Sequence, residues 1–381
     1  MSDIRSKYLF YNNLEFKYQE TIFHELKNGL WKHYSIDNHL RNALIPANQP
    51  HKTLPVLNDY IVVPPGVSLD EEKKVLKEDL YTASFVEMDK VKLLSLFESY
   101  FEQFSNKKIA VHLSGGLDSS IIIGLLNFFK IPFYLVGLES QRFEFRTERA
   151  VQQKLASLGK KTILLDMGKY PSFSNLFNRQ LSQIPDGNIK QVEASKAVAR
   201  VCSELANIVF TGQGGDTLFV DSFPNLPQTW GCNINNEFIP YFEVEHLYPN
   251  EGIELISPFA DKNIINAIYS LRIGAGYDPL KKWARIFFRE FLPRELADYT
   301  YSADFFGTSL SGLDMAKQEI IALFETAYEI TKHNIFSKKE IDTFIKQDVY
   351  DFEYQDYISY CNRISLGVWY NSLNREGYVV K

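Results

Sequence analysis

Two glycines, an aspartate and three serines stand together in HLSGGLDSS, residues 112–120, directly after a short apolar run. Gly115 and Gly116 lack a Cβ atom, so the backbone can turn sharply there and bring its N–H groups close to an anion. Hydroxyl groups that suit phosphate oxygens come from Ser114, Ser119 and Ser120. These residue types at this spacing predict a phosphate cradle where a strand gives way to a helix.

Asp118, inside the same turn, narrows the choice of ligand. A carboxylate beside a polyphosphate is repelled unless a divalent cation lies between them, and Mg²⁺ is bound by one or two carboxylates together with phosphate oxygens. The turn lacks the lysine of the G-x-x-x-x-G-K-[ST] loop and the G-x-G-x-x-G dinucleotide fingerprint. We therefore expect metal-bound pyrophosphate here; the simpler alternative is a strand-to-helix turn capped by Ser or Asp.

A second glycine-rich turn repeats this pattern in TGQGGDTLF, residues 211–219. An apolar run precedes it, Asp216 ends it, and its glycines are Gly212, Gly214 and Gly215. Turns that follow two strands of one parallel sheet can meet in the same crevice, so Asp118 and Asp216 are predicted to act around one metal ion. The alternative for Asp216 is a helix N-cap.

Strand and helix patterns alternate from about residue 88. The strand candidates are 109–113, 132–138, 162–166 and 207–210, and the helix candidates are 88–104, 119–129, 146–159 and 193–206. In the first helix candidate, Val91, Leu94, Phe97 and Phe101 are predicted to form the apolar stripe. The alternation predicts an α/β fold: a parallel sheet of about five strands with helices on both faces. From about residue 258, amphipathic patterns predict a mainly helical C-terminal part.

Residues 1–88 have a different texture, mixed polar and aromatic without a clean period. The run YIVV, residues 60–63, suits a short strand, which Pro64, Pro65 and Gly66 would stop. We expect a small β-containing N-terminal domain over 1–88 and the phosphate-binding domain over 89–381.

Composition narrows the partners and the compartment. The 381 residues carry 41 basic and 47 acidic side chains with no long run of either sign, which disfavours nucleic acid as a partner. The three cysteines are widely spaced and fit neither a disulfide framework nor a zinc site. No apolar signal-peptide core follows Met1, and no apolar run approaches the roughly 20 residues needed to cross a bilayer. We expect a cytoplasmic protein without a membrane partner, and the oligomeric state stays open.

Taken together, the motifs resemble those of the ATP pyrophosphatases that include asparagine synthetase. SGGLDSS resembles the family's pyrophosphate-binding loop, and TGQGGDTLF resembles its second signature. Glu148 stands where the family has an Asp-Glu pair at the start of a helix. Two more segments resemble the family's Ser-Pro-Phe segment and its Lys-x-x-x-Arg helix before Leu-Pro: residues 256–271 and 281–296. The matches keep the family's order over about residues 85–310.

The resemblance implies an adenine nucleotide alpha-hydrolase-like fold and ATP with Mg²⁺ as cofactors. It also implies a reaction: a substrate carboxylate attacks the α-phosphate, pyrophosphate leaves, and an amine displaces AMP to form an amide. Asp118 and Asp216 would be the metal ligands. The implied nucleotide-binding residues are Val111, Leu113, Ser114, Gly115, Gly116, Leu117, Asp118, Ser119, Val136, Gly137, Gly212, Gly214 and Gly215.

One departure from the family concerns the nitrogen donor. Glutamine-hydrolysing asparagine synthetases begin with a processed cysteine, whereas the first cysteine here is Cys202. YIVVPPGVSL, residues 60–69, is similar to the end of the amidotransferase domain, so residues 1–88 are expected to be a degenerate form of it. The arrangement resembles amidotransferase-deficient relatives such as β-lactam synthetases and lasso-peptide cyclases. This implies that the amine comes from the substrate, as in lactam or macrolactam formation.

A second departure concerns the family's catalytic lysine, which normally follows the Leu-Pro segment. No lysine or arginine occurs between Arg294 and Lys317. Either a neighbouring cation substitutes, or a different adenylating reaction occurs, or the protein binds nucleotide without catalysis. The candidate catalytic residues are Asp118, Asp216, Lys281, Lys282, Arg285, Tyr299 and Tyr301. Thr217, where the family has glutamate, indicates a changed acceptor side or metal shell.

Other polar and thiol side chains have simpler interpretations. His112 is expected to lie in the core or beside the adenosine. Arg142, Arg146 and Arg149 form a basic cluster that either steers an anion or covers a solvated helix face. Cys202 is expected in the core.

Overall fold

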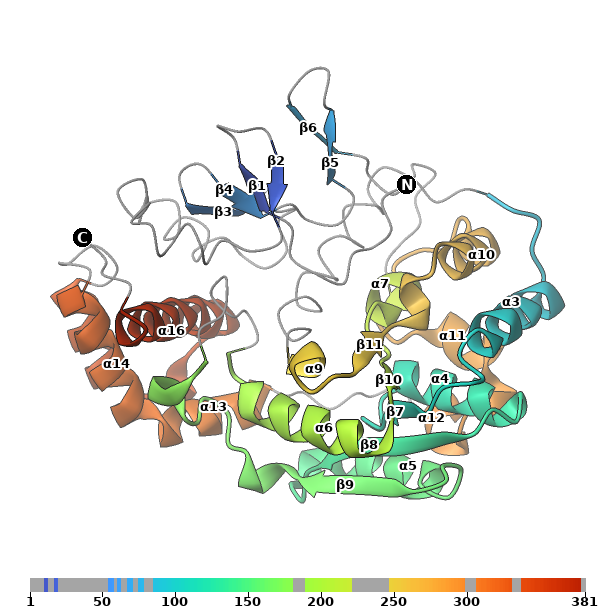
Figure 1. Cartoon of the computed structure of the whole chain (residues 1–381). Coiled ribbons are helices and arrows are strands. Elements are labelled where there is room, and N and C mark those ends of the chain that lie inside the picture. The colour runs from blue at the N-terminus through green and yellow to red at the C-terminus, as the bar shows by residue number, and fades with distance from the viewer. Residues whose placement is uncertain are drawn as a thin grey trace.

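The computed structural model describes residues 85–180, 189–220, 247–298, 306–330 and 337–377, together with short strands within residues 10–78 (Figure 1). Its centre is a five-stranded sheet in the order β11-β10-β7-β8-β9, with every neighbouring pair parallel. The strands are β7 (Ile109–His112), β8 (Phe133–Glu139), β9 (Thr162–Asp166), β10 (Ile208–Phe210) and β11 (Glu254–Ile256). The predicted α/β fold with a parallel sheet is confirmed.

The strand order reverses at β7, which has β8 on one side and β10 on the other. In an open parallel sheet, such a reversal leaves a crevice beyond the carboxyl ends of the two strands. The loops that follow β7 and β10 are the two glycine turns. The topology therefore positions both turns at one edge of the sheet.

Helices cover both faces of this sheet: in Figure 1, α6 crosses in front of the strands while α4 and α5 lie behind them. The helices around the sheet are α3 (Lys90–Glu102), α4 (Leu117–Phe128), α5 (Arg146–Leu155), α6 (Val192–Leu205), α7 (Gly215–Val220), α9 (Leu247–Asn250), α10 (Lys262–Arg272), α11 (Lys282–Phe287) and α12 (Arg294–Asp298). Short 3-10 helices are η2 (Phe143–Phe145), η3 (Met167–Lys169), η4 (Leu176–Asn178), η5 (Pro258–Ala260), η6 (Arg289–Phe291) and η7 (Val349–Asp351).

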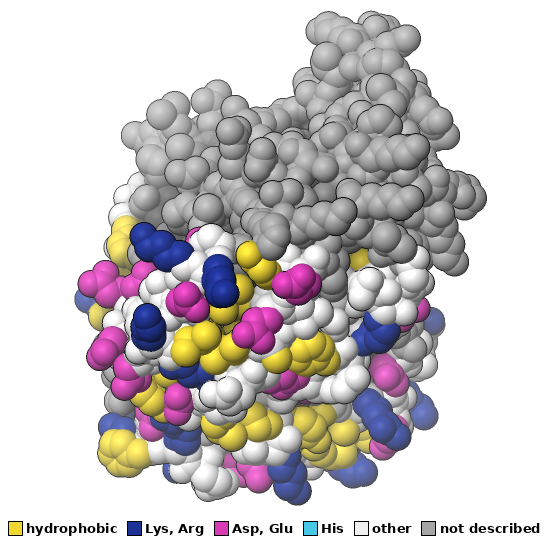
Figure 2. Space-filling view, turned by 90° about the vertical axis from the view of Figure 1, so that its left-hand side faces the viewer, with side chains coloured by type: hydrophobic (Ala, Val, Ile, Leu, Met, Phe, Trp, Pro, Cys, Tyr) yellow, Lys and Arg dark blue, Asp and Glu magenta, His cyan; other side chains and the backbone are white. Residues whose placement is uncertain are grey.

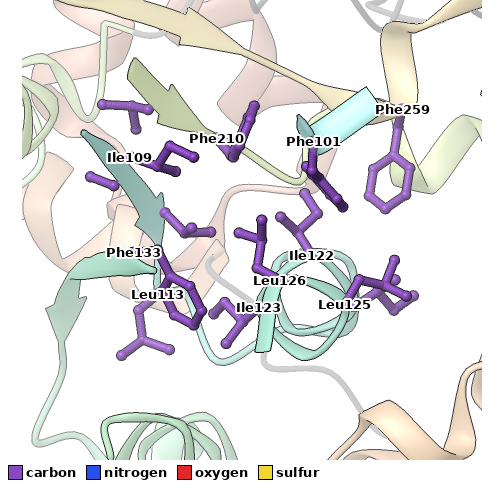
Figure 3. Packing of buried hydrophobic residues seen from close by; sticks show 14 of the residues in the cluster. Phe101, Ile109, Leu113, Ile122, Ile123, Leu125, Leu126, Phe133, Phe210 and Phe259 are labelled. Atoms are coloured by element: carbon purple, nitrogen blue, oxygen red, sulfur yellow. The ribbon is translucent and has the colours of Figure 1, made fainter. Parts of the chain in front are cut away.

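Large rings and branched aliphatic side chains fill the space between the sheet and α4 (Figure 3). Phe101 of α3 and Phe210 of β10 lie edge to face with their centroids 5.4 Å apart. On α3 the buried residues are Leu93, Phe97 and Phe101, spaced four apart, so this stripe faces the core. The prediction that Val91 belongs to the stripe is wrong, because its side chain is 73% exposed.

A second hydrophobic cluster holds the C-terminal helices together. These are α13 (Phe306–Met315), α14 (Lys317–Ile330), α15 (Lys338–Lys346) and α16 (Tyr354–Arg375). Glu319 of α14 accepts a hydrogen bond from the Leu176 amide at 2.6 Å, and Arg375 of α16 donates to the Phe177 carbonyl at 2.7 Å. The mainly helical C-terminal part is therefore attached to the segment that follows the sheet's edge strand β9.

Six antiparallel strands are described within residues 10–78. β2 (Lys17–Gln19), β1 (Phe10–Asn12), β4 (Tyr60–Val62) and β3 (Leu54–Leu57) form one sheet, and β5 (Val67–Asp70) pairs with β6 (Val75–Glu78). The strand predicted at residues 60–63 is present as β4. The rest of residues 1–84 lies outside the described residues, and the domain boundary at 88 stays a prediction.

The surface carries charges of both signs, as the nearly balanced numbers of basic and acidic residues lead one to expect. On the face shown in Figure 2, basic and acidic side chains of the described residues are intermingled. Among the helices that the structure describes, none is both long and apolar enough to span a membrane.

Candidate active site

The first glycine turn requires glycine at position 115 for two separate reasons. Its φ of +82° lies in the left-handed region that favours glycine. A Cβ atom there would also stand 2.5 Å from the carbonyl oxygen of Glu148. Gly116 follows in an extended conformation as the N-cap of α4, without a side-chain cap. The positive end of a twelve-residue helix therefore opens directly beneath the turn.

Serine hydroxyls support this turn from inside. The Oγ atoms of Ser114 and Ser119 lie 2.7 Å apart, and the Gly116 amide donates to Ser114 Oγ at 3.1 Å. Ser120 is fully buried and donates to the Gly116 carbonyl at 2.7 Å. Ser120 therefore stabilises the first turn of α4, and Ser119, which is also buried, donates to the same carbonyl at 3.3 Å. Of these serines, Ser114 lines the cavity described below.

The second glycine turn is in contact with the first. A Cβ atom at Gly212 would stand 2.7 Å from the Ser119 amide nitrogen, and one at Gly215 would stand 2.4 Å from Cγ of Asp118. Gly214, with φ of +84°, makes the bend that allows this approach. The tertiary structure thus brings the acidic residues of both turns together.

Lys281 lies between the two acidic side chains. Its Nζ is 2.6 Å from Asp118 Oδ2 and 2.6 Å from Asp216 Oδ1. The Lys281 side chain is 13% exposed, that of Asp118 16% and that of Asp216 67%. Asp216 is the second residue of α7 and Asp118 the second residue of α4, so neither is the N-cap of its helix. The capping alternatives do not account for these carboxylates.

The other two candidate cations are placed differently. Lys282 is exposed at the first turn of α11. Arg285 is buried, and its guanidinium donates to the carbonyls of Leu280, at 2.9 Å, and of Leu296. Of these three cations, Lys281 is the one that contacts the carboxylates. Arg285 instead links α11 to the backbone on either side of it.

Burial and charge act against each other at this centre. Burial raises the pKa of Asp118, Lys281 opposes that shift, and Asp216 adds to it. Burial disfavours the ammonium of Lys281, but the two carboxylates outweigh burial, so the pKa of Lys281 is raised. Lys281 is therefore positively charged at this centre, and its ammonium group pairs with both carboxylates.

One of the two carboxylate oxygens of Asp118 is available to bind a metal ion. Its Oδ1 is buried and has no hydrogen-bond partner, while Oδ2 binds Lys281. Among the described residues, no group of three or more His, Cys, Asp or Glu side chains could hold a metal ion. Mg²⁺ commonly uses one or two carboxylates and takes its remaining ligands from phosphate and water. The donor set of Asp118 and Asp216 therefore fits a metal that arrives with a polyphosphate.

A cavity of about 480 Å³ lies at the carboxyl ends of β7 and β8, and Ser114 and Gln213 of the two glycine turns line it. Asp118, Asp216 and Lys281 are not among its lining residues. Of the predicted nucleotide-binding residues, Leu113, Ser114, Val136 and Gly137 line it. Val111 is fully buried in the core and is not among the lining residues. Leu117 is also buried, as the first residue of α4.

Gln152, for which the sequence predicts no role, links two strand ends in one wall of the cavity. Its Nε2 donates to the carbonyls of Leu113, at 3.0 Å, and of Leu138, at 2.8 Å. Gly137 allows β7 and β8 to come together here, since a Cβ atom there would stand 2.1 Å from the Leu113 carbonyl oxygen. A glutamine in a polar helix is ordinarily exposed, so the sequence gives no signal for this role.

His112 and Tyr248 form a second polar pair in the cavity wall. The Tyr248 hydroxyl and His112 Nε2 are 2.7 Å apart. Burial lowers the pKa of His112 to about 4, so the ring is neutral near pH 7. His112 lies beside the predicted nucleotide cavity; Tyr248 had no sequence signal.

The three arginines predicted to form a cluster make different contacts. Arg149 lines the cavity and donates to the carbonyls of Ser140 and Arg142. Arg142 pairs with Glu144, with Nε and Oε1 2.6 Å apart, and Arg146 lies over the ring of Phe143.

The remaining predictions fall on one buried thiol and on residues beyond the described ones. Cys202 is buried, and burial raises the pKa of its thiol to about 12, so it is a core residue. Tyr299 and Tyr301 lie outside the described residues, as does the side chain of Thr217.

Comparisons with known proteins support a family assignment for part of the chain. Residues 102–228 match the family model described as asparagine synthase. No curated protein matches the chain.

Three solved structures align with low scores. NMN synthetase from Francisella tularensis is 13% identical, with a TM-score of 0.35 over 77% of this chain and 97% of that chain. The U34-tRNA thiolase NcsA from Methanococcus maripaludis is 13% identical, with a TM-score of 0.29 over 69% and 82%. NAD+ synthetase from Burkholderia pseudomallei is 15% identical, with a TM-score of 0.27 over 62% and 92%. The fold assignment rests on the observed parallel sheet rather than on these scores.

The matched segment contains both glycine turns, Asp118 and Asp216, and most of the cavity wall. The resemblance inferred from the motifs is confirmed at the level of the domain. The match to the asparagine synthase family model covers a third of the chain, residues 102–228.

Proposed function

We propose that this protein is an ATP- and Mg²⁺-dependent, AMP-forming ligase. It activates a substrate carboxylate as an acyl-adenylate and joins it to an amine without hydrolysing glutamine. Membership of residues 102–228 in the asparagine synthase family supports a ligase that uses ATP. The substrate would supply its own amine, as in lactam or macrolactam formation on a small molecule or peptide.

The observation that carries this proposal is the meeting of Asp118 and Asp216 around Lys281. The two turns that carry these acidic residues also reach the cavity, through Ser114 and Gln213. The backbone at Gly115 and Gly116 and the N-terminus of α4 would hold the pyrophosphate. Asp118 and Asp216 would hold Mg²⁺, which supplies positive charge to the leaving pyrophosphate. The wall formed by Leu113, Val136 and Gly137 would hold the nucleoside.

Lys281 would replace the catalytic lysine that the family normally carries after Leu-Pro. Its ammonium is already at the two-carboxylate centre, whereas the segment 295–316 offers no cation of its own. A fixed positive charge near the reacting phosphate stabilises charge that develops in the transition state. The role requires the Lys281 side chain to turn from the carboxylates toward the phosphates.

Two buried free thiols bear on the compartment. Cys202 and Cys361 are both unpaired and buried in the described part of the chain. Free thiols are typical of a reducing compartment, so we place the protein in the cytoplasm.

Pyrophosphate release tests the proposal. The enzyme is incubated with ATP, Mg²⁺ and panels of carboxylic acids that carry an amine, and pyrophosphate and AMP are measured together. We expect equal amounts of both with the right substrate, and loss of at least a hundredfold in Asp118→Asn and Asp216→Asn. Release of ADP and phosphate instead would contradict an adenylating reaction.

A catalytically altered nucleotide-binding protein is the second candidate. The absence of the family lysine between Arg294 and Lys317 favours it. Tight ATP binding that needs Asp118, combined with no pyrophosphate release for any acid in the panel, would support this candidate over the ligase.

A further inference from the structure

We propose that Lys281 excludes free divalent cations from the two-carboxylate centre, so that metal enters only together with the phosphates of the nucleotide. The inference rests on the proposed function, because it takes this centre as the metal–nucleotide site. It adds an order of binding that the proposed function does not require.

The position between the two lysine-bound carboxylate oxygens cannot hold a second cation. Nζ of Lys281 lies 2.6 Å from an oxygen of Asp118 and 2.6 Å from an oxygen of Asp216. Mg²⁺ binds carboxylate oxygens at about 2.0–2.1 Å. A metal ion that bridged these same two oxygens would take the position of the ammonium, and two cations at that separation would repel each other strongly. A metal ion can bridge these two oxygens only if the lysine side chain leaves.

Lys281 is held in this position by its backbone. Its φ of 50° and ψ of 39° place it in the left-handed region at the N-cap of α11. Its amide donates to the Asp278 carbonyl, and its carbonyl accepts from the Arg285 amide, both at 3.0 Å. The side chain is largely buried, so it is not a freely rotating surface lysine. With the backbone held in this way, rotation of the Lys281 side chain is the simplest movement that opens the centre.

A free metal ion and a metal–nucleotide complex differ in whether they provide an anion for the Lys281 ammonium once it has left the carboxylates. A metal ion alone would break both ion pairs and leave a buried ammonium without an anion, which is strongly unfavourable. A polyphosphate that arrives with the metal supplies new anionic oxygens for the same ammonium. Asp118 Oδ1, which is buried and has no hydrogen-bond partner, offers the incoming metal its first oxygen. The lysine therefore couples metal binding to nucleotide binding.

The experiment measures the affinity of the full-length protein for Mn²⁺ alone, from the EPR signal of free Mn²⁺, without nucleotide. The variant is Lys281→Met, which keeps the length of the side chain and removes the charge. The matched control is Lys282→Met, which removes the neighbouring exposed charge on the same helix. Lys281→Arg keeps a cation at the centre. Lys281→Gln replaces the Met variant if that protein does not give the near-UV circular dichroism of the wild type.

We expect Lys281→Met to bind Mn²⁺ alone at least tenfold more tightly than the wild type, and Lys282→Met and Lys281→Arg to stay within twofold of the wild type. Adding the Asp118→Asn substitution to Lys281→Met should abolish the gain. Equal affinity for Mn²⁺ alone in wild type and Lys281→Met would overturn the proposal.

A parallel titration with Mn²⁺ and ATP together separates this inference from the proposed function. If the wild type binds the Mn²⁺–ATP complex but Lys281→Met gains nothing for Mn²⁺ alone, only the exclusion by lysine is overturned. If neither protein binds Mn²⁺ with or without ATP, the proposed function is overturned with it.

Discussion

The backbone of Gly215 lies against the side chain of Asp118, so closely that a Cβ atom at residue 215 would stand 2.4 Å from the carboxyl carbon. This contact joins the second glycine turn to the first acidic residue of the site. The requirement for glycine at position 215 therefore comes from the other turn and not from its own dihedral angles.

Gly215→Ala should damage the site more than the fold. The added methyl group must push Asp118 away from Lys281 or shift the start of α7, at a cost of about 1–3 kcal/mol in the free energy of unfolding. We expect ATP affinity, measured by calorimetry with Mg²⁺, to fall at least tenfold. Gly276→Ala is the control, since a Cβ atom there meets no other atom within 4 Å. Unchanged ATP affinity in Gly215→Ala would show that Asp118 does not contact the metal–nucleotide complex.

Arg285→Met should destabilise the helix that carries Lys281. The substitution leaves the buried carbonyls of Leu280 and Leu296 without their guanidinium donors, which we expect to lower the free energy of unfolding by about 2–4 kcal/mol. Urea denaturation measures the change. Arg289→Met, on the exposed side of the same segment, removes only an ion pair with Asp298 and should change stability by less than about 1 kcal/mol. Similar effects of the two substitutions would contradict a structural role for Arg285.

Gln152→Leu should weaken the cavity wall. The carbonyls of Leu113 and Leu138 lose their shared donor, at a cost of about 1–3 kcal/mol for the unsatisfied groups. We expect a lower thermal midpoint and weaker ATP binding. Gln153→Leu is a matched control one residue along α5, where the side chain is exposed. If Gln152→Glu, which sets a carboxylate against the two carbonyls, were as stable as the wild type, the hydrogen bonds to Gln152 could not be what joins the strand ends.

His112 should make the stability of the fold depend on pH. Its pKa is about 4 in the folded protein and ordinarily 6.5, so the unfolded chain binds the proton more tightly. The stabilising contribution of the neutral ring is therefore complete above pH 6.5 and is lost as the pH falls from 6.5 toward 4. Between pH 7.5 and 5.0 this loss amounts to about 2 kcal/mol.

Urea denaturation of wild type and His112→Gln at these two pH values measures that contribution. Both proteins share the titration of their carboxylates, so the difference between them isolates the histidine. We expect the wild type to lose about 2 kcal/mol more than the variant. Equal losses would mean that the pKa of His112 is not lowered in the folded protein.

The sequence was enough to predict the central sheet and the two turns, because these features depend on local interactions. Alternating apolar segments predict strands and helices of a parallel sheet, and positive φ at Gly115 and Gly214 requires residues without a Cβ atom. No strand was predicted at β11, because its three residues include the charged, exposed Glu254 and so form no apolar run like that of β10. Val91 was assigned to the wrong side of α3, because its spacing to Phe97 and Phe101 fits a helix less well than that of Leu93.

The acidic residues, the glycines and the phosphate and metal chemistry that suits them could be predicted from the sequence, because they follow from residue types at short spacing. Which cation contacts the carboxylates could not be predicted from the sequence: in the folded chain it is Lys281, and not Lys282 or Arg285. The choice depends on the left-handed backbone at residue 281 and on contacts between segments more than 150 residues apart. The pairing of His112 with Tyr248 depends in the same way on distant segments, and no local pattern in the sequence encodes it.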